Sequence, residues 1–429
     1  MKIIQVLLTL VLTSFFFFPF YTTFLPTINT KMIVAALGGI LLLVKLARTG
    51  SAQIDKGIFS VSLWAALVSL VSLMSMVLNN TPDDSYLGYV VSMWVWLSAA
   101  YFVVSAIRFT HGSVTIERVC VYLISVGVLQ CLLAVAVDTI PTVKVFVDSI
   151  LEGEGFMGKN EDRLYGLGCA LDVAGTRFSA LLIMIAFLLP KAAQKERSEL
   201  YLTLLLTAFC ILVSIGSIIG RTTVVGAVLS LLYIFYVLCF KKNITDTARN
   251  KLARWIVCGL CVGFVVAVCL YNVSPQWQKY FQFGFEGFFS LAETGRWEVH
   301  SNSQLADQFI WPDNMWTWII GDGYIASTTI DPYYIGKTWV GFYKGTDVGY
   351  SRFLFYFGLI GLTTFSLFFV KTCQVCADRI KEYRDMFIIF LMINFIVWLK
   401  VSTDIFVVFA PFLCLSALKK EECQELVEQ

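Results

Sequence analysis

The stretch YLTLLLTAFCILVSIGSIIGRTTVVGAVLSLLYIFYVLCF, from Tyr201 to Phe240, contains a single charged residue, Arg221. A helix that crosses a bilayer needs about 20 predominantly apolar residues, so this stretch is long enough for two such helices. Only the turn GSIIGRT would separate them. The stretch therefore predicts a helical hairpin inside a membrane, with an arginine at its tip.

The composition of the 429 residues extends this prediction to the whole chain. Hydrophobic residues make up 58% and charged residues 14%, with a mean hydropathy of +0.76. Soluble domains are about half apolar and about a quarter charged, so a soluble enzyme, a secreted disulfide scaffold and a nucleic-acid-binding domain are poor candidates. The net charge of +2 is too small to indicate a polyanionic partner. We expect an all-α, polytopic integral membrane protein.

Twelve apolar segments are candidates for membrane-crossing helices. The first resembles a signal peptide, but no small-x-small cleavage site follows it, and we interpret it as a span. The segments are 3–20, 32–47, 58–78, 86–107, 119–137, 178–190, 200–217, 221–240, 255–272, 350–370, 386–400 and 402–418.

The distribution of Lys and Arg predicts the orientation of these helices. With the N-terminus in the cytoplasm, the cytoplasmic loops carry 20 of the 32 basic residues, as the positive-inside rule requires. Both termini are then cytoplasmic. The expected organisation is helices 1–5 in 1–137, an external loop in 138–177, helices 6–9 in 178–272, a large external loop in 273–349, helices 10–12 in 350–418 and a cytoplasmic tail in 419–429.

The large external loop, 273–349, should be folded. It contains six of the eleven Trp, which a disordered segment would lack, and we expect short helices lying on the membrane surface. Its Trp residues fit either interfacial anchoring or stacking on sugars. Both external loops are acidic overall, and the external arginines occur singly, as Arg163, Arg177, Arg221, Arg296 and Arg352.

Arginine in this setting points to phosphate recognition, because its planar guanidinium binds phosphate in a bidentate manner. Arg221 is the best candidate, since it starts a span and neighbouring backbone N–H groups could share an anion with it. The alternative is an arginine that only extends to the interface. No pair of carboxylates and no His/Cys cluster predicts a bound metal.

Several motifs resemble those of bacterial O-antigen polymerases of the Wzy type. GTDVGYSRFLFYFGLIGL (345–362) resembles the stretch that ends the large periplasmic loop of that family, and TGRWEVH (294–300) resembles a segment near its start. IIGDGY (319–324), SIIGRTT (217–223) and EDRLYGLG (161–168) resemble the Gly-x-Gly turn, the arginine turn and the Arg-x-x-Gly of the earlier loop.

The resemblance implies a GT-C-like, inverting, metal-independent membrane glycosyltransferase of lipopolysaccharide biosynthesis without a cofactor. Such an enzyme polymerises undecaprenyl-diphosphate-linked oligosaccharide repeat units at the periplasmic face of the inner membrane. The lipid-linked oligosaccharide is both donor and acceptor, and the resemblance implies a chain-length regulator and a flippase as partners.

Residue roles follow from these motifs. Arg221 and Arg296 would bind the diphosphate, and Asp347 would be the base, although it could instead cap the helix that follows it. His300, four residues after Arg296, is an alternative base. The second-tier candidates for substrate binding are Arg163, Arg177, Arg352, Trp297 and Tyr350, and Arg352 could instead pair with Asp347.

Two other functions share part of this pattern. An O-antigen ligase would have the same architecture, but the ligases carry a histidine in the stretch where this chain has Asp347. A flippase or secondary transporter would place ionisable residues and broken helices near the bilayer midplane, whereas the charges here lie at or outside the external interface.

Overall fold

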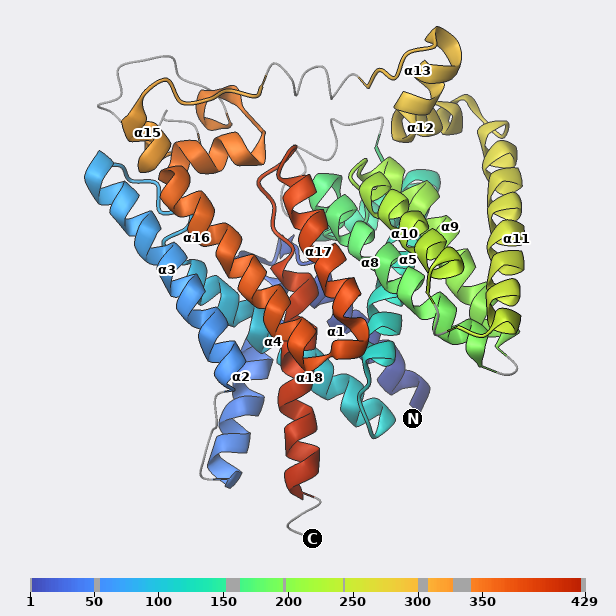
Figure 1. The fold of residues 1–429 in the computed structure, drawn as a ribbon, viewed down its shortest axis with the longest axis horizontal. Coiled ribbons are helices and arrows are strands. Elements are labelled where there is room, and N and C mark those ends of the chain that lie inside the picture. The colour runs from blue at the N-terminus through green and yellow to red at the C-terminus, as the bar shows by residue number, and fades with distance from the viewer. Residues whose placement is uncertain are drawn as a thin grey trace. The chain divides into compact units, whose positions relative to one another are not determined.

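A computed structural model describes residues 2–49, 55–151, 163–195, 198–241, 244–299, 308–326 and 341–425. These residues form sixteen α-helices, two 3-10 helices and one two-stranded sheet (Figure 1). Eight of the described helices are long and apolar enough to cross a membrane, so the chain is a multi-pass membrane protein by helix length and hydropathy. They are α2 (Thr30–Thr49), α3 (Lys56–Asn79), α4 (Tyr89–His111), α5 (Ile116–Thr139), α8 (Leu171–Gln194), α9 (Glu199–Ile219), α11 (Asp246–Tyr271) and α16 (Gly349–Arg379).

Each of the twelve predicted apolar segments contains a helix. Eight of these helices are the ones named above, and the other four are shorter or only partly apolar. These four are α1 (Lys2–Phe17), α10 (Thr223–Cys239), α17 (Arg384–Val397) and α18 (Phe406–Glu425). The sixth segment, predicted as a short helix over 178–190, needs correction because α8 has 24 residues and begins at Leu171. Its first turns contain polar side chains that the helix accommodates: Thr176 Oγ1 donates to the Asp172 carbonyl at 2.7 Å.

Short elements occupy the segments that were predicted as external loops. The segment 138–177 contains α6 (Pro141–Ile150), and the segment 273–349 contains the expected short helices. The latter are α12 (Pro275–Gly284), α13 (Glu286–Thr294), α15 (Met315–Ile319) and the 3-10 helix η2 (Tyr343–Gly345), while η3 (Lys381–Tyr383) lies between α16 and α17.

The described chain divides into two compact units, each made from two stretches of sequence. Unit 1 comprises 1–39 and 99–297, and unit 2 comprises 40–98 and 298–429. The core of unit 1 is α8, which is 94% buried over its most apolar window and packs against α5, α9 and α10. Gly226 of α10 lies so close to α8 that a Cβ there would be 2.2 Å from the Ser179 Cα. The helices can therefore pack backbone to backbone, as small residues allow in membranes.

A small β-hairpin follows α1 in unit 1 and was not predicted. Strands β1 (Tyr21–Thr22) and β2 (Leu25–Asn29) are antiparallel, with Tyr21 opposite Asn29. Thr22 also forms a bridge with Leu151, directly after α6. The hairpin after α1 is thereby attached to the segment that follows α6.

Unit 2 is built around α16, which packs against α3, α17 and α18. Aromatic rings fill the contact with α17: the Trp398 ring lies 4.8 Å from Phe353 and 5.2 Å from Phe365, centroid to centroid. Trp398 is completely buried. These rings fix the start of α16, where the predicted Asp347 and Arg352 lie.

Helix α16 is broken near its start. Phe357 (φ −137°, ψ 16°) and Gly358 (φ 64°, ψ −165°) are not helical, and the short piece before the break lies at a steep angle to the rest of α16 (Figure 1). The carbonyls freed by the break are bonded elsewhere: Asp322 N donates to Phe355 O at 2.6 Å and Gly323 N to Tyr356 O at 3.1 Å. The GDG turn therefore replaces the missing helical hydrogen bonds.

Candidate functional site

The arginine turn between α9 and α10 is held by hydrogen bonds from α8. Ser179 Oγ donates to the Thr222 carbonyl at 2.7 Å, and Thr222 Oγ1 donates to the Asp172 carbonyl at 3.2 Å. Gly220 touches the start of α8, and a Cβ there would be 2.3 Å from the Leu171 carbonyl oxygen. The small residues of SIIGRTT therefore let the turn pack directly against α8. The Arg221 side chain lies against Phe283 instead.

Two arginines meet on one aromatic ring in unit 1. The guanidinium carbon of Arg221 lies 3.9 Å from the ring centroid of Phe283, and that of Arg163 lies 4.8 Å from the same centroid. Arg221 Nη1 is 2.8 Å from Glu286 Oε2. We call Arg163, Arg221, Phe283 and Glu286 the arginine cluster. It joins the loop before α8, the α9–α10 turn and the α12–α13 segment.

The electrostatics of the arginine cluster favour an anionic ligand. The Arg221 side chain is only 17% exposed. Burial lowers the pKa of Arg221, Glu286 raises it, and the neighbouring positive charge of Arg163 lowers it further. Two guanidiniums near one ring repel each other, whereas the carboxylates of Glu286 and Asp172 both raise the pKa of Arg221. A ligand with several negative oxygens could contact both guanidiniums at once.

Helix α12 brings Phe283 into this cluster. Ser274 caps the helix by accepting a hydrogen bond from Trp277 N, and Pro275 occupies its first turn, which is a favourable start for a helix. The buried Tyr280 hydroxyl lies 2.5 Å from Asp138 Oδ1 at the end of α5. The α12 segment is therefore fastened to the helix bundle of unit 1.

The other arginines that the sequence predicts in unit 1 lie in different surroundings. Arg177 is buried within α8, with its guanidinium carbon 5.6 Å from the Phe18 ring centroid, and so it belongs to a helix and not to the predicted loop. Arg296 is exposed directly after Gly295, which ends α13 with φ 71°. Trp297 is 53% exposed and its ring packs edge-on against Phe288, with 4.9 Å between the ring centroids.

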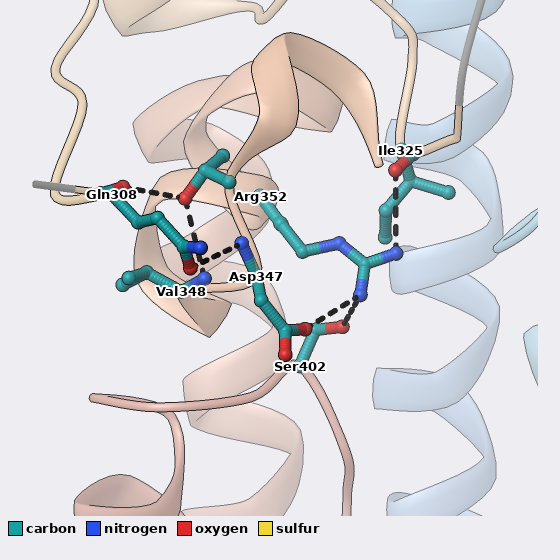
Figure 2. A network of polar contacts seen from close by, with 7 residues as sticks. Gln308, Ile325, Asp347, Val348, Arg352 and Ser402 are labelled. Carbon is teal, nitrogen blue, oxygen red and sulfur yellow. Dashed lines mark hydrogen bonds and ion pairs between the residues drawn. The ribbon is translucent and has the colours of Figure 1, made fainter. Parts of the chain in front are cut away.

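The predicted Asp347 and Arg352 form an ion pair in unit 2, at 3.8 Å between Asp347 Oδ1 and Arg352 Nη1. Figure 2 shows the Arg352 guanidinium with Asp347 and Ser402 on one side and the Ile325 carbonyl on the other. Arg352 Nη1 donates to Ser402 Oγ at 2.7 Å and Nη2 donates to the Ile325 carbonyl at 3.3 Å. The guanidinium carbon also lies 4.1 Å from the Phe342 ring centroid. Arg352 is thus fixed on several sides, and Asp347 is oriented by it.

Asp347 does not cap α16, which corrects the capping alternative. The N-cap residue is Val348, and no side chain caps this helix. The Asp347 backbone N–H instead donates to Gln308 Oε1 at 3.4 Å, and Thr346 Oγ1 donates to the Gln308 carbonyl at 2.6 Å (Figure 2). Its carboxylate is 35% exposed, so it is accessible as well as oriented.

Tyr350 and His300 are the two remaining residues that the sequence predicts for the site. Tyr350 donates its hydroxyl to the Phe395 carbonyl at 3.0 Å and its ring packs edge-on against Trp398, which accounts for it as a contact between α16 and α17. His300 lies outside the described residues. Among the residues described, no group of three or more His, Cys, Asp or Glu is arranged to hold a metal ion.

Asp83 supports the Arg352 site, although the sequence did not single it out. Its Oδ2 accepts hydrogen bonds from Ile325 N at 2.8 Å and Ala326 N at 3.3 Å, and the Ile325 carbonyl is the one that accepts from Arg352. Nothing in TPDDS distinguishes this aspartate from an ordinary turn residue. Phe283 and Glu286 were missed for the same reason, since no spacing separates them from the other aromatic and acidic residues of their loop.

Comparisons of the chain with protein-family models, with curated proteins and with solved structures find no match. The contacts of the arginine cluster and of the Asp347–Arg352 pair therefore indicate what the protein can do, together with the motifs that resemble O-antigen polymerases.

Proposed function

We propose that this protein is a membrane glycosyltransferase that polymerises undecaprenyl-diphosphate-linked oligosaccharide repeat units into a surface polysaccharide of the O-antigen kind. The observation that carries the proposal is the arginine cluster, in which Arg163 and Arg221 meet on the Phe283 ring. Two partly buried guanidiniums at the end of membrane-crossing helices suit a lipid-linked diphosphate, which has apolar and polyanionic parts.

In the proposed reaction, an acceptor hydroxyl attacks the anomeric carbon of the sugar attached to the lipid diphosphate. A new C–O glycosidic bond forms, the bond between the anomeric carbon and the phosphate oxygen breaks, and undecaprenyl diphosphate leaves. Arg221 and Arg163, with Arg296 as a further contact, stabilise the charge that develops on the leaving diphosphate. Asp347 accepts the hydroxyl proton, and Arg352 is a positioning residue for it. The reaction needs no cofactor.

The finer topology belongs to the same proposal. Twelve helices would cross the bacterial inner membrane, with both termini in the cytoplasm and with α6, α12, α13 and α15 on the periplasmic side. The lipid-linked oligosaccharide, membrane lipids, a chain-length regulator and a flippase would be the partners.

The decisive experiment is incubation of the purified protein with one defined lipid-linked repeat unit, followed by separation of the products by length. We expect a ladder of glycans with the wild type and a loss of about 100-fold or more in extension rate with Arg221→Ala, as for removal of a charge-stabilising donor. Lys279→Ala is the matched control, because Lys279 is an exposed cation on α12 outside the arginine cluster. A ladder of normal length with Arg221→Ala would contradict the proposal.

Other functions give other outcomes in these experiments. A transporter would produce no ladder in a reaction without a second compartment. A ligase would attach glycan to lipid A core but would not lengthen it, and cells without the protein would then carry no glycan on lipid A core. Cells without a polymerase would carry single repeat units.

A further inference from the structure

A cavity with a partly polar lining lies in unit 1, at one end of three membrane-crossing helices. It has a volume of about 390 Å³ and is lined by residues from the end of α4, the start of α5 and the start of α9. Cavities of this size can hold a small ligand or a headgroup. Because all three helices are long enough to cross the membrane, their ends lie at the level of the lipid headgroups.

Arg118 gives this cavity its positive charge. Its Nη1 donates to both the carbonyl and the Oγ of Ser113, at 2.6 Å each, which fixes the plane of the guanidinium. Its Nε and Nη2 make no hydrogen bond to any other residue that the structure describes. The acidic residue of the lining, Glu117, is paired with Lys195 at 3.0 Å. The edge of the Arg118 guanidinium that carries Nε and Nη2 therefore remains available to a ligand. The acid of the cavity, Glu117, is already paired with Lys195.

Two more hydrogen-bonding groups line the same cavity. His111 Nε2 is 2.9 Å from the Tyr122 hydroxyl, which holds the ring and leaves Nδ1 for another partner. Tyr201 also lines the cavity, and its hydroxyl has no hydrogen bond within the described part of the chain. Val121 and the tyrosine rings supply apolar wall between these groups.

We propose that this cavity binds the phosphodiester headgroup of an anionic phospholipid. The guanidinium edge of Arg118 matches two phosphate oxygens, and His111 and Tyr201 can bond the remaining oxygens. A lipid fits better than a soluble anion because Val121 and the tyrosine rings make much of the wall apolar. Phe109, two residues before His111 on α4, is 79% exposed and offers a surface to acyl chains. Basic cavities between membrane helices bind anionic headgroups in this manner. The inference does not depend on the proposed glycosyltransferase activity.

The test is lipid binding by the full-length protein in non-ionic detergent, measured by native mass spectrometry during titration with phosphatidylglycerol or phosphatidylcholine. We expect tighter binding of phosphatidylglycerol, a loss of about tenfold in its affinity with Arg118→Gln, and a loss of about threefold with Tyr201→Phe, as for loss of a charged and a neutral hydrogen bond. Arg384→Gln, which removes an exposed arginine outside the cavity, should leave the affinity unchanged.

Three results would overturn this inference. The first is equal affinity for the two lipids, and the second is an equal loss with Arg118→Gln and Arg384→Gln, which would indicate a general charge effect. The third is displacement of phosphatidylglycerol by inorganic phosphate at a similar concentration, which would assign the cavity to a soluble anion. If Arg118→Gln does not fold, Tyr201→Phe still decides the matter, since it removes only one hydroxyl.

Discussion

At the scale of single residues, the arginines of this chain differ in what holds them. Arg221 lies against the face of Phe283 and beside Glu286, whereas Arg352 donates to Ser402 and to a backbone carbonyl. An aromatic face attracts a guanidinium without using its hydrogen-bond donors. Arg221 is therefore held mainly by an aromatic ring and an acid, while Arg352, fixed by oxygen acceptors, is suited to orienting a neighbour.

Asp347 provides the sharpest test at this scale, because it does not cap α16. We expect Asp347→Asn to reduce glycan extension by about 100-fold or more, as for removal of a general base, and to change the free energy of unfolding by less than about 1 kcal/mol. The extension assay and thermal unfolding in detergent measure the two effects. Extension near the wild-type rate would rule out Asp347 as the base.

At the scale of elements, the break in α16 explains why two glycine-containing motifs occur together. Gly358 has φ 64° and ψ −165°, and a Cβ there would lie 2.3 Å from the Ile319 carbonyl carbon and oxygen. Gly321, at φ 86°, also lies close to the broken helix, since a Cβ there would be 2.6 Å from the backbone of Tyr356 and Phe357. Each glycine allows the turn and the helix to approach closely enough for the hydrogen bonds that join them.

Gly358→Ala should therefore destabilise unit 2 strongly. Both the backbone conformation and the contact with Ile319 exclude a methyl group, and we expect a loss of about 3 kcal/mol or more in stability. The matched control is Gly88→Ala, since Gly88 has open space around it, and it should change stability by less than about 1 kcal/mol. Thermal unfolding of both variants in detergent measures the difference, and equal melting temperatures would disprove the assigned role of Gly358.

At the scale of the whole molecule, the basic residues should determine the topology. Because the predicted topology puts 20 of the 32 basic residues on the cytoplasmic side, we expect alkaline phosphatase fused after Asn272 to be active and a fusion after Lys420 to be inactive. A fusion after Lys241, between α10 and α11, is the inactive control. Phosphatase activity at the C-terminal position would mean that the number of crossings is odd and that the twelve-helix topology is wrong.

The sequence predicted the positions of the helices better than it predicted which residues contact one another. Apolar runs locate a helix because each run must bury or face lipid along its whole length, and all twelve runs contain one. The start of α8 was missed because Asp172 and Arg177 looked like loop residues. The pairing of Arg352 with Asp347 was predicted as an alternative and is confirmed. Phe283 reaches Arg221, and Asp83 reaches the loop that accepts from Arg352, from distant parts of the chain, which no local pattern encodes.

The replaced hydrogen bonds of α16 also bear on how the chain enters the membrane during synthesis. In the folded protein the break leaves the Phe355 and Tyr356 carbonyls without helical partners, and a carbonyl without a partner away from water costs several kcal/mol. Their donors are Ser75, Asp322 and Gly323, and all three precede α16 in the chain. The ribosome therefore delivers every donor before the helix that needs it. Insertion of α16 is then a tertiary folding step, completed against parts of the protein that are already in place.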